Sequence, residues 1–96
     1  MSRHVVDIAN PNAGETHAVI GWDRMLERYF VQIYASEGDD EKVTREWEGE
    51  GLSELVENGI LLVMPADLVG RLMYEATGFA NANGCIDWRH SEPERR

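Results

Sequence analysis

Alternating apolar and polar residues in the first third of the chain predict three β-strands, over residues 4–9, 16–21 and 27–35. The third segment is the richest in aromatic and β-branched residues, which favour strands. Turn-forming residues 10–14 separate the first two segments, and residues 22–25 predict a bend before the third. Because these connections are short, we expect antiparallel pairing.

The pattern changes after residue 35. Residues 36–42 are mostly charged and predict a loop, and residues 43–47 predict a fourth strand. Leu52, Leu55 and Val56 share one face of a helix predicted over residues 52–58.

Gly59 follows this first helix, where a left-handed C-cap is expected. After a buried connector over residues 60–64, Pro65 can begin a second helix that ends at Gly78. The expected buried stripe of the second helix contains Leu68, Leu72 and Met73. Residues 79–84 predict a loop, and residues 86–88 are expected to pack back on the sheet.

Strand periodicity followed by helical periodicity is typical of the α+β class. We expect one domain over residues 1–90, with a small antiparallel sheet of three to four strands and one or two helices packed on it, and a disordered tail over residues 91–96. The third strand is apolar on both faces, so the face without the main helix needs a cover. The candidates are the helix over residues 52–58, the segment around Trp88 or a second subunit, and we favour a homodimer.

Two segments together resemble a group of small uncharacterised bacterial proteins. The first is Gly21-Trp-Asp-Arg-Met-Leu-Glu-Arg-Tyr-Phe30, where the group carries Gly-aromatic-Asp-Arg-Pro-Leu, two variable residues and two aromatics leading into a strand. The second runs from Gly59-Ile60 through Met64-Pro65 to residues 81–84, where the group has Gly-Ile, Leu-Pro, a helix and an Asn-x-Gly-Asn ending. Met25 replaces the expected Pro, and Asn83-Gly84-Cys85 departs from the Gly-Asn ending. The resemblance implies a related fold, and since the group has no assigned activity it implies no function.

Charge is distributed unevenly along the chain. The formal net charge is −9, and seven of those charges fall within residues 37–57. This stretch holds nine carboxylates against only Lys42 and Arg45; the carboxylates are Glu37, Asp39, Asp40, Glu41, Glu46, Glu48, Glu50, Glu54 and Glu57. An acidic surface attracts cationic partners and repels nucleic acid and anionic membranes. Direct binding to nucleic acid or membrane is therefore not expected.

The acidic segment suggests a non-catalytic interaction protein that binds a basic protein surface. The residues expected to contact the partner are Glu37, Asp39, Asp40, Glu41, Glu46, Trp47, Glu48 and Glu50. Trp47 is flanked by two glutamates, and an exposed aromatic ringed by acids would serve as an anchor in a basic pocket. The most concrete version is a small inhibitor of a nucleic-acid enzyme, of the anti-CRISPR or other anti-defence type, that imitates the charge of nucleic acid. The alternative is a solvated face that only maintains solubility.

The bend at residues 21–24 offers a secondary candidate site. Trp22 and Arg24 are residue types enriched at binding hot spots, although a turn that fixes strand register would need the same sequence.

The sequence contains few residues arranged for catalysis. His4, His17 and His90 are widely spaced and form no metal motif, and no phosphate-binding glycine loop is present. The single Cys85 cannot form an internal disulfide, which suits a reducing cytoplasm. We therefore expect no enzyme activity, no metal and no cofactor. Two other functions stay open: an accessory protein that dimerises through its sheet, and a small enzyme or ligand-binding domain that uses Cys85 or a histidine.

Overall fold

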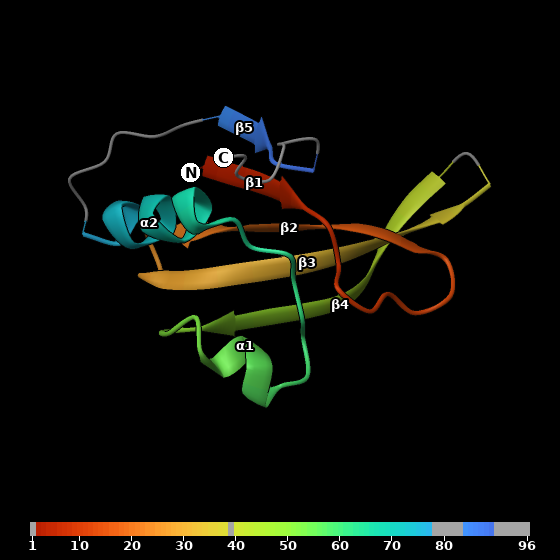
Figure 1. Ribbon diagram of the computed structural model, residues 1–96, viewed down its shortest axis with the longest axis horizontal. Helices are drawn as coiled ribbons and strands as arrows, with labels where there is room; N and C mark the ends of the chain where they lie inside the picture. The colour runs from red at the N-terminus through yellow and green to blue at the C-terminus, as the bar shows by residue number, and fades with distance from the viewer. Residues whose placement is uncertain (1, 39, 78–83, 90–96) are drawn as a thin grey trace, which may run out of the picture.

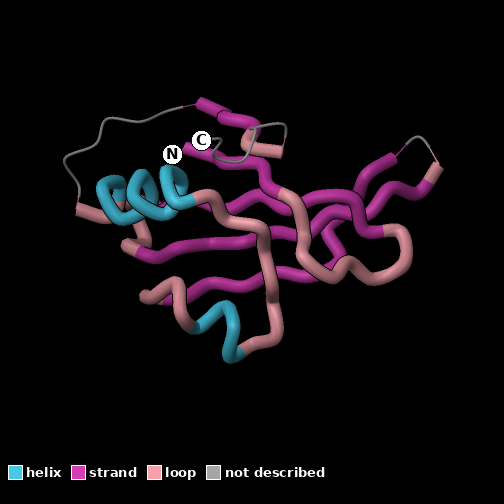
Figure 2. Tube along the Cα trace, viewed as in Figure 1, coloured by secondary structure: helices cyan, strands magenta, loops and turns pink. Residues whose placement is uncertain are grey.

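The computed structural model describes residues 2–38, 40–77 and 84–89, and it belongs to the α+β class (Figures 1 and 2). The elements in chain order are β1 (Ser2–Val6), β2 (Glu15–Asp23), β3 (Arg28–Glu37), β4 (Asp40–Gly49), α1 (Glu54–Glu57), α2 (Ala66–Glu75) and β5 (Gly84–Asp87). No helix among these residues has the length and apolar character needed to cross a membrane. The predicted loop at residues 79–83 and the tail at residues 91–96 lie outside the described residues.

The sheet has five strands in the order β4-β3-β2-β1-β5. Strands β1 to β4 form an antiparallel meander, whereas β5 pairs with β1 in parallel. The chain reaches β5 only after both helices, because parallel neighbours need a crossover connection. The prediction of three to four antiparallel strands therefore comes close to the observed sheet, but it does not include the parallel edge strand β5.

Strand β4 is longer than the sequence predicts, because residues 40–42 of the expected charged loop belong to it, while residues 36 and 37 belong to β3. Asp40 pairs with Glu37 and Glu41 with Ser36, so only two residues separate the paired ends of β3 and β4. Asp and Glu are poor strand formers, but pairing along the whole of β3 compensates for that preference. Strand β2 likewise continues through Trp22 to Asp23, and the bend falls on residues 24–27.

The second helix follows the sequence prediction closely. Pro65 occupies the N-cap, and Leu68 and Leu72 are fully buried. The prediction that Met73 is buried is wrong, because its side chain is 59% exposed. Glu75 takes the third buried position instead, since residues three and four apart share one face of a helix.

The remaining helical segment is shorter than expected. Helix α1 is a single turn, and Gly59 follows it with a φ of 76°, the left-handed conformation that the C-terminal glycine predicts. The connector over residues 60–64 is buried only in part, because Leu61 and Val63 are exposed while Ile60 lies in the core. It runs beside the end of β1, with a bridge between Ile8 and Leu62.

Both helices and the connector lie on one side of the sheet (Figure 1). We call this side the helix face and the opposite side the open face. The helix face holds the core, which contains Val6, Ile8, Ala18, Ile20, Tyr29, Val31, Ile33, Trp47, Leu55, Ile60, Leu68 and Leu72. No helix or strand within residues 2–38, 40–77 and 84–89 covers the open face.

Candidate partner-binding face

A β-bulge in β4 determines which side of the sheet each charged residue occupies. Ile33 of β3 pairs with Arg45, but the next residue, Tyr34, pairs with Val43, so Thr44 is the extra residue. The alternation of side chains between the two faces of the sheet therefore shifts by one residue at the bulge.

The result is a separation of charge between the two faces. Glu46 and Glu48 lie opposite Gln32 and Phe30 on the open face, and Glu41, opposite Ser36, lies on that face as well. Lys42 lies opposite the buried Ala35, on the helix face. The open face of β4 thus carries three carboxylates and no cation.

Arg45 on the helix face is neutralised by a carboxylate from another strand. Its Nε and Nη2 donate to the two oxygens of Glu15, at 3.0 and 2.9 Å, and the Thr44 hydroxyl donates to Glu15 at 2.9 Å. The hydrogen bonds from Arg45 hold the pKa of Glu15 below its ordinary value of 4.5. The cation closest in sequence to Glu46 is therefore already paired with another carboxylate.

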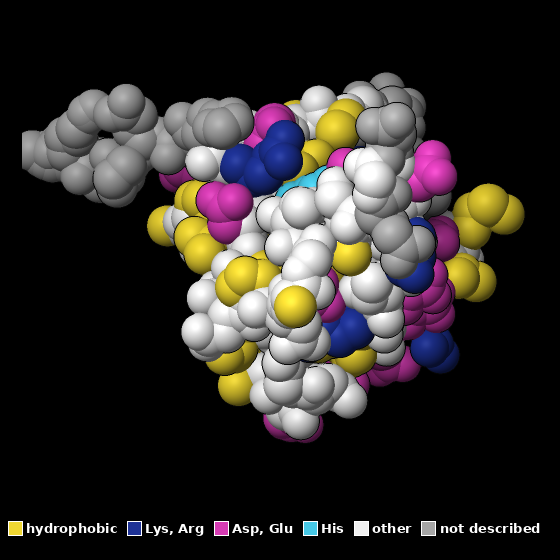
Figure 3. Space-filling model, turned by 90° about the vertical axis from the view of Figure 1, so that its right-hand side faces the viewer, with side chains coloured by type: hydrophobic (Ala, Val, Ile, Leu, Met, Phe, Trp, Pro, Cys, Tyr) yellow, Lys and Arg dark blue, Asp and Glu magenta, His cyan; other side chains and the backbone are white. Residues whose placement is uncertain are grey.

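Glu46 and Glu48 line a shallow groove on the open face with a volume of about 230 Å³. Its other lining residues are Arg3, Asp23, Phe30, Val31, Gln32 and Trp47. Three carboxylates therefore border one half-buried aromatic ring, that of Phe30. Within the described part of the chain, neither Glu46 nor Glu48 has a side-chain hydrogen bond or ion pair. Acidic side chains gather along the right-hand side of the view in Figure 3.

The centre of the open face is held by a short polar network. The Arg3 guanidinium donates to the Tyr34 hydroxyl at 3.1 Å, and this hydroxyl donates to Gln32 at 3.1 Å. The His17 ring stacks on Tyr34 with a centroid distance of 5.1 Å. Val19 lies beneath these side chains and is only 3% exposed. The open face therefore covers part of its own apolar surface, but Phe30 stays half-buried.

The structure brings some of the predicted contact residues together and separates others. Glu41, Glu46 and Glu48 share the open face, whereas Asp40 lies opposite Glu37 on the other side of β4, and Glu50 follows the strand. Asp39 and the side chain of Glu37 lie outside the described residues.

The expectation that Trp47 is an exposed anchor is wrong. It lies opposite Val31 on the helix face and is 8% exposed. A Cβ added at Gly49 would lie only 2.2 Å from the indole Cζ2, so the ring packs over this glycine. The flanking glutamates point to the other face because the strand alternates. Phe30 is the aromatic residue that accompanies them, a role the sequence analysis did not assign.

The secondary candidates Trp22 and Arg24 line a different hollow of about 660 Å³, together with Glu27, Glu50 and others. Trp22 packs edge-on against Tyr29, with ring centroids 4.9 Å apart, so it supports the core from the end of the sheet. Asp23 accepts hydrogen bonds from the backbone N–H groups of Met25 and Leu26. These contacts fit the turn that fixes strand register.

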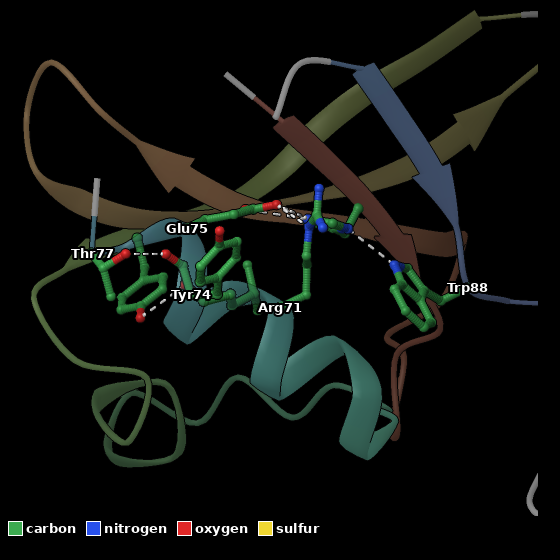
Figure 4. Close-up of polar contacts among 8 residues, drawn as sticks. Arg71, Tyr74, Glu75, Thr77 and Trp88 are labelled. Atoms are coloured by element: carbon green, nitrogen blue, oxygen red, sulfur yellow. Dashed lines mark hydrogen bonds and ion pairs between the residues drawn. The ribbon is translucent and has the colours of Figure 1, made fainter. Parts of the chain in front are cut away.

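A buried polar cluster, which the sequence analysis did not identify, joins β1 to α2 and to the residue after β5. His4 is fully buried, and its Nε2 lies 3.1 Å from Glu75 Oε2, which also accepts a hydrogen bond from Arg71 Nε at 3.1 Å. Glu75 and Trp88 reach the cluster from opposite sides (Figure 4). The signal in the sequence is a histidine at an inward position of the first strand and a glutamate seven residues after Leu68 on the second helix.

The contact with Trp88 determines the tautomer of His4. The indole Nε1–H donates to His4 Nδ1 at 3.0 Å, and an indole nitrogen can only donate. Nδ1 therefore carries no proton, and the ring proton lies on Nε2, from which it is donated to Glu75. Burial and the Glu75 charge also raise the pKa of the nearby Tyr29 hydroxyl.

The residues considered for catalysis lie apart. His4 has no exposed surface for a substrate, Cys85 is exposed on β5, and His90 lies outside the described residues. No group of three or more metal-ligating side chains occurs among residues 2–38, 40–77 and 84–89. No hydrogen bond joins Cys85 to a histidine within the described part of the chain.

Comparison with protein-family models, with curated proteins and with solved structures gives no match. The resemblance carried by residues 21–30 and 59–84 therefore stays a prediction.

Proposed function

We propose that this chain is a non-catalytic interaction protein that binds a basic protein surface through the open face of its sheet. The observation that carries the proposal is the position of Glu46 and Glu48, which lie without side-chain partners among the described residues and border a groove beside Phe30. An apolar ring bordered by carboxylates is complementary to an Arg or Lys side chain, whose aliphatic part packs on the ring while its charge meets a carboxylate.

The separation of charge by the bulge supports this proposal further. If the acidic residues only maintained solubility, mixing them with Lys42 and Arg45 on one face would serve equally well. Instead, the open face of β4 presents three carboxylates and no cation of its own, and Arg3 is the cation that lines the groove beside them; these carboxylates would attract a basic partner. The concrete version is an inhibitor that occupies the nucleic-acid site of a basic enzyme.

Charge reversal on the open face tests the proposal directly. A partner is first captured from cells that produce the protein, identified by mass spectrometry and purified. The double variant E46K/E48K should then bind this partner at least about tenfold more weakly, and binding of the parent should weaken as salt rises. If the concrete version holds, DNA or RNA should compete with the parent for the partner.

E57K is the control for net charge, which it changes by +2 against +4 for E46K/E48K, because Glu57 is an exposed carboxylate on α1, away from the open face. It changes the net charge in the same direction but should leave affinity within about twofold. Equal weakening by E57K would indicate a general charge effect, and unchanged binding by E46K/E48K would exclude the groove as the contact.

A second candidate function is self-association through the same face. Val5, Val43 and Phe30 leave apolar surface on a side that no described helix covers. Sedimentation at micromolar concentration distinguishes the two, since a homodimer through this face would compete with the basic partner. The like charges of Glu41, Glu46 and Glu48 oppose a contact between copies, so the basic partner is the first proposal.

A further inference from the structure

Strand β4 is ten residues long and forms one edge of the sheet. Apart from the pairing with β3, residues 43–49 of this strand make no backbone hydrogen bond to another segment within the described residues. Residues 40–44 are all exposed, and they extend with β3 away from the helices (Figure 1). An edge strand of this length presents a row of unpaired N–H and C=O groups that can template another strand.

The side chains of β4 disfavour pairing with a second copy of itself. In the antiparallel register that overlaps all ten residues, Glu41 of one copy would lie opposite Glu48 of the other, and this contact would occur twice. Like charges directly opposite each other destabilise a strand pair. Charge therefore disfavours this fully overlapping pair, and the bulge at Thr44 disfavours edge pairing as well, whereas β4 contains no proline.

The same charges favour a strand of opposite sign. We propose that β4 accepts an extended segment with Lys or Arg at alternate positions, which adds a sixth strand to the sheet. This inference rests on the proposed function and names the form of its partner. Glu46 and Glu48 are two residues apart, about 7 Å along the strand, and alternate residues of an added strand have the same spacing.

In this arrangement the cations of the partner lie on the open face, next to Glu41, Glu46 and Glu48. The residues between them lie on the helix face, where Trp47 and Leu55 belong to one buried cluster. The partner segment should therefore alternate basic residues with apolar or β-branched ones. A basic helix would contact the groove by side chains only and would leave the β4 backbone unpaired.

The test uses a synthetic peptide, about as long as β4, in which Lys alternates with Val or Thr. Two further peptides are N-methylated on the backbone: one on the amide nitrogens of the Lys residues, the other on the amide nitrogens of the intervening residues. Each set of methyl groups removes the backbone donors along one edge of the peptide strand and leaves the Lys side-chain charges unchanged. Binding to the full chain is followed by NMR, as changes in the β4 amide shifts and as protection of β4 amides from hydrogen exchange. We expect at least one methylated peptide to bind more than about tenfold more weakly than the parent peptide.

The outcomes separate this inference from the proposed function. If both methylated peptides bind as tightly as the parent peptide, or if the β4 amides gain no protection, strand addition is wrong. Should E46K/E48K still weaken binding of every peptide in that case, the basic partner on the open face stands. If a peptide with Glu in place of Lys binds equally well and E46K/E48K changes nothing, both proposals fail.

Discussion

The two faces of the sheet differ in whether their polar side chains have hydrogen-bond partners. On the helix face, no buried side-chain nitrogen or oxygen of the described residues lacks a hydrogen-bond partner, and the cluster of His4, Glu75 and Trp88 is the main example. On the open face, the Arg3–Tyr34–Gln32 network satisfies the centre, but Glu46 and Glu48 lie without partners among the described residues. A buried polar group needs a hydrogen-bond partner to offset its desolvation, whereas an exposed carboxylate without a protein partner costs little free energy because it stays hydrated. The helix face is therefore specialised for stability, and the open face retains the groups that a partner can use.

The largest expected effect on this comparison comes from Trp47→Ala. The change removes a buried ring beside Val31 and should lower the free energy of unfolding by roughly 3–5 kcal/mol. The charge-dependent part of binding, measured as its salt dependence, should change little in the fraction that stays folded, because the ring faces away from the carboxylates. A thermal melt alongside a binding curve checks both. If binding weakens while stability stays the same, Trp47 belongs to the partner site after all.

Adjacent residues of β1 provide the next test, since His4 and Arg3 lie on opposite faces. His4→Leu leaves the Trp88 indole without its acceptor and Glu75 without one donor, so it should cost about 2–4 kcal/mol. Arg3→Leu removes an exposed hydrogen bond and should cost less than about 1 kcal/mol. Urea unfolding of the two variants decides whether the faces differ, and equal losses would contradict the comparison.

Alkaline pH should weaken the helix face through Tyr29. Its pKa is raised by burial and by Glu75, so the unfolded chain ionises first, near the ordinary value of 10.0. The stability that this group contributes is complete below about pH 10 and is lost as the pH rises through the folded value. Tyr29→Phe should make the free energy of unfolding fall less steeply above pH 10. An unchanged slope would mean that other groups cause the loss.

The smallest effect on stability is expected on the open face. E46Q/E48Q should change the free energy of unfolding by no more than about 0.5 kcal/mol, because both side chains are exposed and the variant keeps their shape. Affinity for a basic partner should nevertheless fall, and its salt dependence should become shallower. Chemical denaturation together with binding at two salt concentrations measures both quantities.

Much of the fold follows from local patterns in the sequence. Gly59, Pro65, Leu68 and Leu72 have the roles that capping and helical periodicity predict. Strand β5 is harder to predict, because four residues carry little periodicity and their partner β1 is distant in sequence. Met73 and Glu75 show a related limit. Hydrophobicity favours Met73 for the core, but the presence of His4 makes a buried Glu75 acceptable, and no local pattern reports that contact.

The candidate site is predictable only in outline. The sequence shows that acids gather between residues 37 and 57, but the bulge at Thr44 decides which of them share a face. The prediction that Trp47 is exposed is wrong because it relies on the charged neighbours, whereas strand alternation places a residue on the face opposite to both of its neighbours. Strand alternation places Phe30 on the same face as Gln32 and Tyr34, yet its position beside Glu48 depends on the register of two strands.

The parallel pairing of β1 with β5 has a consequence for how the chain folds. The meander of β1 to β4 uses neighbouring segments and can form early, but β5 must return across both helices to meet β1. Closing such a long loop is entropically slow, so the outer side of β1 stays unpaired until late in folding. During synthesis, β1 is complete long before β5 leaves the ribosome. For that interval the nascent sheet has two open margins, and the one at β1 carries no run of acids to keep other chains away.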